Sequence, residues 1–158
     1  MYKSFSEISV HYPKTKIILL SIASVFCGGL IYVLFRPTEP IFFDWFNTIG
    51  IENYIESIRG KSTTISPFLP GWIVFSLPSG LWAFAYTLFI LCIWSGSKSV
   101  IKYFWYLSIP VLLFGAEFLQ LIGNLPGTFC WKDVFATTVG TIVGIITQKI
   151  ILFRTNVK

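Results

Sequence analysis

Long apolar segments alternate with short polar ones along the whole chain. Four segments of about 20 residues, the length that crosses a bilayer as a helix, carry almost no charge: 17–35, 72–94, 103–122 and 134–153. The third segment holds Glu117 and the fourth holds Lys149 near its end, while the other two hold no charged residue. A bilayer core is about 30 Å thick and a helix rises about 1.5 Å per residue. The pattern therefore predicts an all-α integral membrane protein with four transmembrane helices in a single domain, 1–158.

The polar segment between the first two predicted spans has a pattern of its own. Over 41–58, apolar side chains recur roughly at helical spacing and the charged ones fall between them. The apolar members are Phe42, Trp45, Phe46, Ile49, Tyr54, Ile55 and Ile58. We expect an amphipathic helix in the outer interface, aromatic side toward the lipid, with Gly50 as a candidate break and 60–66 as a polar loop. Such a helix fits either a membrane-surface anchor or a lid over a site.

The composition supports a membrane protein, and the distribution of charge predicts how the chain is oriented in the membrane. Hydrophobic residues make up 54% of the chain and charged residues 12%, against about 25% charged in soluble domains. Eight of the 12 Lys and Arg residues lie on the predicted side that holds both termini, and four lie on the other side. Because cytoplasmic loops carry the excess of positive charge, both termini are expected in the cytoplasm. The net charge of +5 then reflects topology and contact with anionic membrane lipids, and not nucleic acid, because the basic residues form no stripe.

The candidate chemistry lies in the last two spans and the turn between them. Glu117 is the one carboxylate inside a long apolar segment, and Gln120 and Asn124 follow it by three and seven positions. Residues at those spacings share one face of a helix. Asp133 and Thr137 begin the next apolar segment. The two helices are expected to place these polar side chains around one small volume near the turn, with Lys132 as the nearest cation.

Three interpretations of this cluster remain open. The polar side chains bind the head group of a lipid or cell-wall precursor, or Glu117 carries a proton or a small cation, because an ionisable group within the membrane is costly without a role. In the third, Glu117 and Gln120 clamp the turn and Asp133 caps the last helix. Along that last helix, Ala136, Gly140 and Gly144 repeat every four residues. This spacing predicts close helix packing, with homo- or hetero-oligomers through the fourth helix as a further outcome.

Other chemistry finds little support in the residue pattern. The three cysteines Cys27, Cys92 and Cys130 have neither CxxC nor His-paired spacing, so no metal site or cofactor is expected. Serine, histidine and cysteine are not assembled near the hairpin as a nucleophile and its base. The pattern therefore favours a binding protein, while a membrane enzyme acting on a lipid-linked substrate and a structural subunit stay open as alternatives.

At this hairpin the sequence resembles the VanZ-like family of small integral membrane proteins. The resemblance covers about 30 residues. It consists of a Glu with a Gln three positions later, a Pro-Gly turn, an Asp, and two Gly residues on the last helix: Glu117, Gln120, Pro126-Gly127, Asp133, Gly140 and Gly144. Two positions depart from the family pattern. Thr137 stands where the family often has Asn, and Thr128 lies near the place of an Arg that often follows the turn.

The resemblance implies a multi-pass protein of the bacterial cell (inner) membrane that belongs to the cell envelope. It also implies a link to glycopeptide antibiotic resistance. With the residue pattern, it leads us to expect a lipid or cell-wall-related ligand at an outward-facing site built from Glu117, Gln120, Asn124, Asp133 and Thr137. In that site Glu117 would accept hydrogen bonds or act as a base, and Gln120 would orient the ligand.

Overall fold

The computed structural model describes residues 5–36, 42–124 and 128–156, and these residues are helical apart from short connections. The elements are α1 (Phe5–Phe35), α2 (Phe42–Ile49), α3 (Glu52–Ile65), the short 3-10 helix η1 (Ser66–Phe68), α4 (Gly71–Phe75), α5 (Leu77–Ile93), α6 (Ile101–Leu121) and α7 (Trp131–Asn156). The prediction of an all-α protein is confirmed for this part of the chain, which contains no strand.

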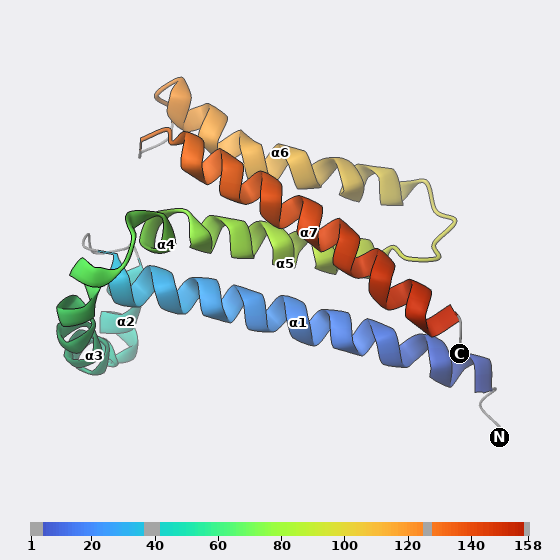
Figure 1. Cartoon of the computed structure of the whole chain (residues 1–158), viewed down its shortest axis with the longest axis horizontal. Coiled ribbons are helices and arrows are strands. Elements are labelled where there is room, and N and C mark those ends of the chain that lie inside the picture. The colour runs from blue at the N-terminus through green and yellow to red at the C-terminus, as the bar shows by residue number, and fades with distance from the viewer. Residues whose placement is uncertain (1–4, 37–41, 125–127, 157–158) are drawn as a thin grey trace.

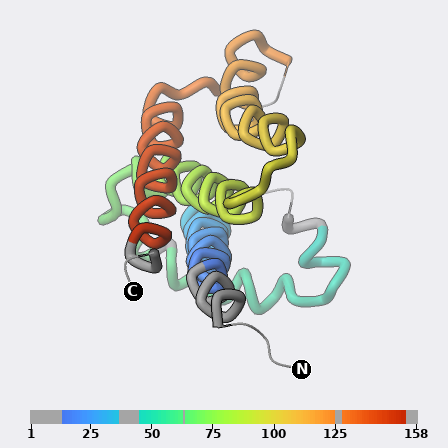
Figure 2. The backbone as a smooth tube through the Cα atoms, turned by 90° about the vertical axis from the view of Figure 1, so that its right-hand side faces the viewer, coloured from blue at the N-terminus to red at the C-terminus, as the bar shows by residue number. Residues whose placement is uncertain are grey.

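The four long helices α1, α5, α6 and α7 lie side by side (Figure 1). The start of α1, the end of α7 and the α5–α6 loop lie at one end of the bundle. The helices α2 and α3 and the connection from α6 to α7 lie at the other end. Viewed along the helices, α5 is in the middle, with α1 and α7 against it and α6 on its remaining side (Figure 2).

Three helices are long and apolar enough to cross a membrane: Lys14–Phe35 within α1, Ile101–Leu121 as α6, and Trp131–Phe153 within α7. Large apolar side chains cover the outer surfaces of these helices, including Phe26, Phe104 and Phe135 with exposed fractions of 65%, 69% and 71%. An apolar exterior of this extent is the normal surface of a chain surrounded by lipid. The structure therefore defines a multi-pass membrane protein.

The segment expected to form one span over 72–94 is instead divided into two helices. The short helix α4 ends at Phe75, and α5 begins at Leu77 after a turn at Ser76. Pro78 explains the break, because proline has no N–H to donate to the carbonyl of Val74, and its ring crowds that carbonyl. The break lies just before the Pro78-Ser79-Gly80 sequence. The remaining apolar helix, Leu77–Ile93, has 17 residues.

The central helix α5 is held by close contacts with α7 and α1. A Cβ at Gly80 would lie 2.9 Å from the carbonyl oxygen of Ala136, and one at Gly144 would lie 3.1 Å from that of Phe84. These distances show that the two backbones approach each other directly, as small residues allow. On the other side, Ile17 of α1 and Leu88 and Cys92 of α5 form a buried cluster.

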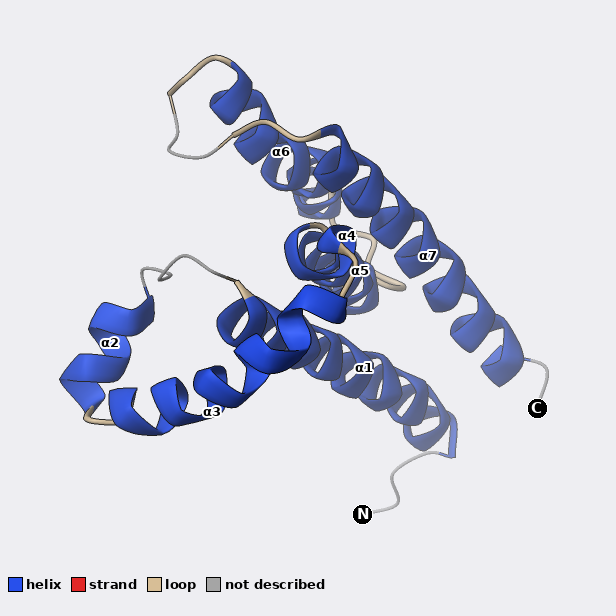
Figure 3. Ribbon diagram, turned by 60° about the vertical axis from the view of Figure 1, so that its left-hand side comes forward, coloured by secondary structure: helices blue, strands red, loops and turns tan. Residues whose placement is uncertain are grey.

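The polar segment between α1 and α4 forms two helices, α2 and α3, because Gly50 breaks it with a positive φ of 77°. Such an angle suits glycine, which has no Cβ to clash. The second helix, α3, continues to Ile65, so the polar loop expected over 60–66 is wrong. The hydroxyl of Ser62 donates to the carbonyl of Ile58 within that helix, at 3.1 Å. Figure 3 shows α3 leading toward the end of α1, with α2 farther from it.

Arg59 attaches α3 to α1. Its guanidinium donates to the carbonyl oxygens of Val33 at 3.1 Å and Arg36 at 3.0 Å. The last carbonyls of a helix have no partner within that helix, so the arginine satisfies two of them at the end of α1. This contact fixes the position of Arg36, the last described residue before 37–41.

Candidate functional site

A polar cavity of about 850 Å³ opens at the end of the bundle that carries α2 and α3. Residues from α1, α4, α5, α6 and α7 line it, together with the segment that leads into α7. Its polar and charged lining residues are Tyr32, Arg36, Ser76, Ser79, Trp82, Gln120, Glu117, Thr128, Cys130, Lys132, Asp133 and Thr137. The remaining wall is apolar and includes Phe75, Leu112 and Leu113.

Four of the five residues proposed from the sequence line this cavity. Glu117 and Gln120 come from the last part of α6, and Asp133 and Thr137 come from the first part of α7. The Oε2 atom of Glu117 accepts a hydrogen bond from the backbone N–H of Cys130 at 3.4 Å. This bond joins α6 to the segment that precedes α7, so it holds the two carboxylates on neighbouring walls of one space.

The fifth proposed residue, Asn124, does not line the cavity and is exposed. The helix α6 ends at Leu121, and Gly123 then takes a positive φ of 75°. The backbone N–H of Asn124 donates to the carbonyl of Leu119 at 2.9 Å, as in a common glycine-dependent helix end. The spacing of seven from Glu117 places Asn124 on the same face only in a continuous helix, and this helix stops first. The Pro126-Gly127 turn lies outside the described residues.

Two cations share the cavity with the two carboxylates. Lys132 lies beside Asp133 in the first turn of α7, and Arg36 follows the end of α1. Arg36 is far from the hairpin in sequence and was not predicted as part of the site. A weak signal for it exists, because an arginine directly after an apolar span is placed near the membrane interface where the hairpin turn also lies.

Arg36 is held by its neighbours on several sides. Its guanidinium carbon lies 4.3 Å from the ring centre of Tyr32 and 5.9 Å from that of Phe75. Contacts of a guanidinium with aromatic faces are favourable and leave its N–H groups free to donate. The Tyr32 ring in turn contacts the Trp82 ring, with centres 5.5 Å apart. The aromatic side chains therefore orient this cation on one wall of the cavity.

The charged groups of the cavity are not paired with one another within the described residues. Arg36 and Lys132 contribute two positive charges, and Glu117 and Asp133 contribute two negative charges. The Oδ1 atom of Asp133 is buried and has no hydrogen-bond partner among the described residues. A buried polar atom without a partner costs free energy. The arrangement therefore provides separate donors and acceptors for a ligand that carries both.

The small residues of α7 lie on a different face from the cavity charges. Ala136, Gly140 and Gly144 face the central helix α5, where Gly140 approaches the backbone of Gly80. Thr137 is buried, and its carbonyl accepts a hydrogen bond from the hydroxyl of Thr141 at 2.8 Å. The close α5–α7 packing thus fixes the position of Asp133 and Thr137 along the bundle axis, beside the polar cavity.

The described residues contain no group of three His, Cys, Asp or Glu side chains that could hold a metal ion. The three cysteines are free: Cys27 is exposed, Cys92 is buried, and Cys130 lines the cavity. No histidine is among the described residues of the cavity wall. What the wall offers is a mixture of hydrogen-bond donors, acceptors and fixed charges beside an apolar surface.

The fold and cavity together define a class, a multi-pass α-helical membrane protein with a charged cavity at one end of its bundle. Comparison with protein families, with curated proteins and with solved structures finds no match for this chain.

Proposed function

We propose that this chain is a VanZ-like protein of the bacterial cell membrane whose polar cavity binds the head group of a lipid or lipid-linked cell-wall ligand. The observation that carries the proposal is the lining of the cavity. Two cations and two carboxylates lie around one space of about 850 Å³ without pairing with one another in the described structure. Charges left unpaired in a partly apolar space are costly unless a ligand satisfies them.

The charge pattern of the cavity supports a head group that carries both a negative and a positive charge. Arg36 and Lys132 would hold a phosphate or carboxylate, because guanidinium and ammonium groups make strong charge-assisted hydrogen bonds to such anions. Glu117 and Asp133 would accept hydrogen bonds from an ammonium or from hydroxyl groups, with Gln120 orienting the ligand. In the VanZ-like pattern an Arg often follows the turn, and in this chain Thr128 lies near its place. Arg36, directly after the end of α1, supplies a cation to the same cavity.

The proposal includes four spans, with both termini in the cytoplasm. α4 and α5 together cover 71–93, and at about 1.5 Å per residue α5 alone is about 26 Å long. That length is close to the bilayer core of about 30 Å. The polar cavity then opens toward the outer leaflet. The exposed aromatic and apolar residues of α2 and α3, such as Trp45, Ile49 and Tyr54, would lie in the outer interface.

Binding is favoured over the alternative of a structural subunit assembled through α7. The small residues of α7 that could join two chains already contact α5 within this chain. An enzyme acting on a lipid-linked substrate remains the second class. Cys130 and the hydroxyl groups of the cavity have no histidine base among the described lining residues. Formation of a product from a lipid-linked substrate would be needed to support this class.

The first test is native mass spectrometry of the detergent-extracted protein, with Glu117→Gln compared with wild type and with Glu56→Gln. The substitution keeps the shape of the side chain and removes its charge. Glu56 is an exposed carboxylate of α3 outside the cavity, so it is a matched control. We expect a retained lipid on wild type and on Glu56→Gln, and loss of that lipid from Glu117→Gln at unchanged thermal stability.

A second pair of variants tests the cations. Arg36→Gln should lose the ligand, whereas Lys61→Gln, an exposed basic residue of α3, should retain it. If wild type retains no ligand, or if all variants retain it equally, the cavity is not the binding site and the proposed function is wrong.

A further inference from the structure

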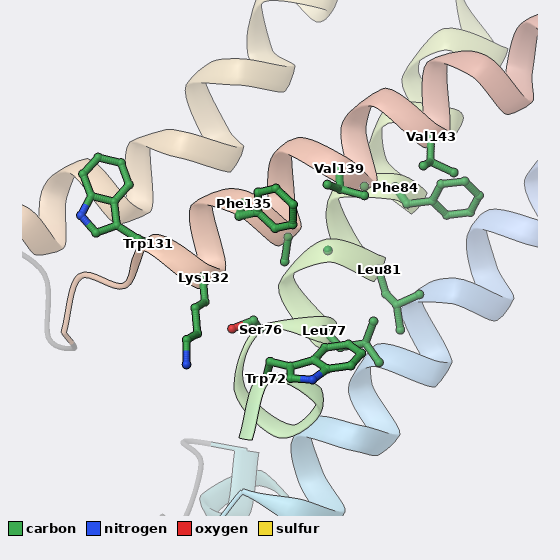
Figure 4. A pocket seen from close by; sticks show the side chains of 13 residues that line it. Trp72, Ser76, Leu77, Leu81, Phe84, Trp131, Lys132, Phe135, Val139 and Val143 are labelled. Carbon is green, nitrogen blue, oxygen red and sulfur yellow. The ribbon is translucent and has the colours of Figure 1, made fainter. Parts of the chain in front are cut away.

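A second hollow lies between α4–α5 and α7, on the side facing away from α6. This apolar groove has a volume of about 840 Å³. Its wall is almost entirely hydrocarbon, with Leu77, Leu81 and Phe84 on one side and Phe135, Val139 and Val143 on the other (Figure 4). The close approach of Gly80 and Gly140 forms its floor. The groove is therefore a slot between two helices in the apolar part of the chain.

The apolar groove and the polar cavity share part of their walls. Trp72, Ser76 and Lys132 line both spaces. In Figure 4 the Lys132 side chain extends from α7 toward Trp72 and Ser76, across the mouth of the groove. Lys132 is the one charged side chain among the described residues that line the groove. The charged cavity and the apolar groove therefore adjoin each other beside a cation.

The length of the groove matches one leaflet of a bilayer. It follows α7 from Trp131 to Val143, a distance of about 18 Å at about 1.5 Å per residue. Half of a bilayer core of about 30 Å is about 15 Å. The tryptophans Trp72 and Trp131 lie at the same end as Lys132, as expected where a helix meets the head-group region. In the proposed four-span arrangement, the groove would start near the head groups and end near the middle of the membrane.

We propose that this groove holds an acyl chain of a bilayer phospholipid whose phosphate is bound by Lys132 and whose remaining head group enters the polar cavity. This inference rests on the proposed function for the head group and adds the identity of the tail. A groove that spans one leaflet fits a chain that spans one leaflet, and it is far too short for a polyisoprenoid carrier. The cation at its mouth selects an anionic phosphate over an uncharged lipid.

A neighbouring hollow gives a natural comparison. An apolar depression of about 630 Å³ lies between α1 and α5 and is lined by residues that include Val25, Phe26 and Phe89. No charged side chain is among its described lining residues. Lipid in that depression would be ordinary solvation of the protein surface, whereas the groove beside Lys132 binds a defined lipid.

The test uses phosphatidylethanolamine and its soluble head group, glycerophosphoethanolamine, with the full-length protein in detergent. Val139→Phe fills the groove from a side chain with an exposed fraction of 42%. Val111→Phe is the same substitution on the exposed surface of α6, where the side chain lines neither space. We expect the affinity for phosphatidylethanolamine, measured by native mass spectrometry, to fall about tenfold in Val139→Phe and to stay unchanged in Val111→Phe.

The two ligands separate this inference from the proposed function. Glycerophosphoethanolamine should raise the thermal unfolding temperature of wild type and of Val139→Phe equally, and should have no effect on Glu117→Gln. If Val139→Phe retains the phospholipid as wild type does, or if Val25→Phe loses it instead, the acyl chain does not lie in this groove. A wild type that is dimeric and a Val139→Phe that is monomeric would assign the groove to a second copy and overturn the inference. Failure of the soluble head group to stabilise wild type would instead reject the head-group site.

Discussion

Among the described glycines, Gly140 is the one where an added Cβ would come closest to another atom. A Cβ at this position would overlap the backbone carbonyl oxygen of Gly80, and a backbone atom cannot rotate away as a side chain can. Gly140→Ala is therefore expected to lower the free energy of unfolding by about 1–3 kcal/mol, the usual cost of overpacking. Thermal unfolding in detergent measures this change.

Gly115 provides the matched control for Gly140. It also lies within a long helix, and a Cβ there would meet no atom within 4 Å. Gly115→Ala should leave the unfolding temperature unchanged or raise it slightly, because alanine favours helix. Equal effects of the two substitutions would mean that α5 and α7 are not in direct backbone contact.

The site residues differ in how far the sequence could place them. Glu117 and Gln120 share a face because α6 continues unbroken to Leu121. Asn124 leaves that face because Gly123 ends the helix in a left-handed conformation. For Arg36 the sequence offered only a position near the membrane interface, because its place on the cavity wall depends on Arg59 and Phe75, which are distant in sequence, as well as on Tyr32 one turn earlier. Spacing along one helix is local information, whereas the cation on the opposite wall is a tertiary contact.

At the scale of elements, the Arg59 side chain helps to hold α3 against the end of α1. The Arg59 guanidinium bonds two carbonyl oxygens at the end of α1, and each hydrogen bond to a charged group contributes about 1.5–3 kcal/mol. In Arg59→Ala, backbone amides of α3 should exchange with deuterium about tenfold faster as this helix separates locally. Hydrogen–deuterium exchange with mass spectrometry measures the effect.

Lys61→Ala is the control on the same helix, because Lys61 is exposed. The backbone amides of α3 in Lys61→Ala should exchange with deuterium at the wild-type rate. Since Arg59 also positions the backbone of Arg36, the Arg59→Ala variant should bind the ligand of the polar cavity more weakly. Unchanged exchange in Arg59→Ala would show that α3 is held by its connection to η1 and α4 instead.

The elements themselves were predictable where the pattern was long and uniform. The predicted spans 17–35, 103–122 and 134–153 correspond closely to the membrane-length apolar helices Lys14–Phe35, Ile101–Leu121 and Trp131–Phe153. The helix α1 itself begins earlier, at Phe5. The segment 72–94 was apolar enough to suggest one span, and its division depends on the local effect of Pro78 on the preceding turn. The helix α3 continues past Gly60 because tertiary contacts through Arg59 favour helix where composition suggested a loop.

At the scale of the whole molecule, the two ends of the bundle are chemically different. One end carries the α5–α6 loop with Lys98 and both described chain ends, and the other carries α2, α3 and the polar cavity (Figure 1). The alternation of apolar and polar segments along the sequence anticipated this grouping without any knowledge of packing. It could not anticipate that α5, the shortest of the four long helices, packs most extensively against both α1 and α7. That role depends on small residues such as Gly80 and Ala83, which are unremarkable in a hydropathy pattern.

The last prediction concerns whether α4 and α5 together cross the membrane. Lys61 in α3 and Lys98 in the α5–α6 loop are both exposed, and α5 is the one long helix that lies between them in the chain. Lys61→Cys and Lys98→Cys can therefore be compared with a membrane-impermeant maleimide, with labelled sites located by peptide mass spectrometry so that the native cysteines remain. We expect Lys61→Cys to be labelled in intact cells and Lys98→Cys only after the membrane is opened.

Labelling of both from one side would mean that α5 does not cross, and the chain would then have three spans with its termini on opposite sides. Labelling of Lys98→Cys alone in intact cells would keep the four spans but invert them, so the polar cavity would face the cytoplasm and its lipid would come from the inner leaflet.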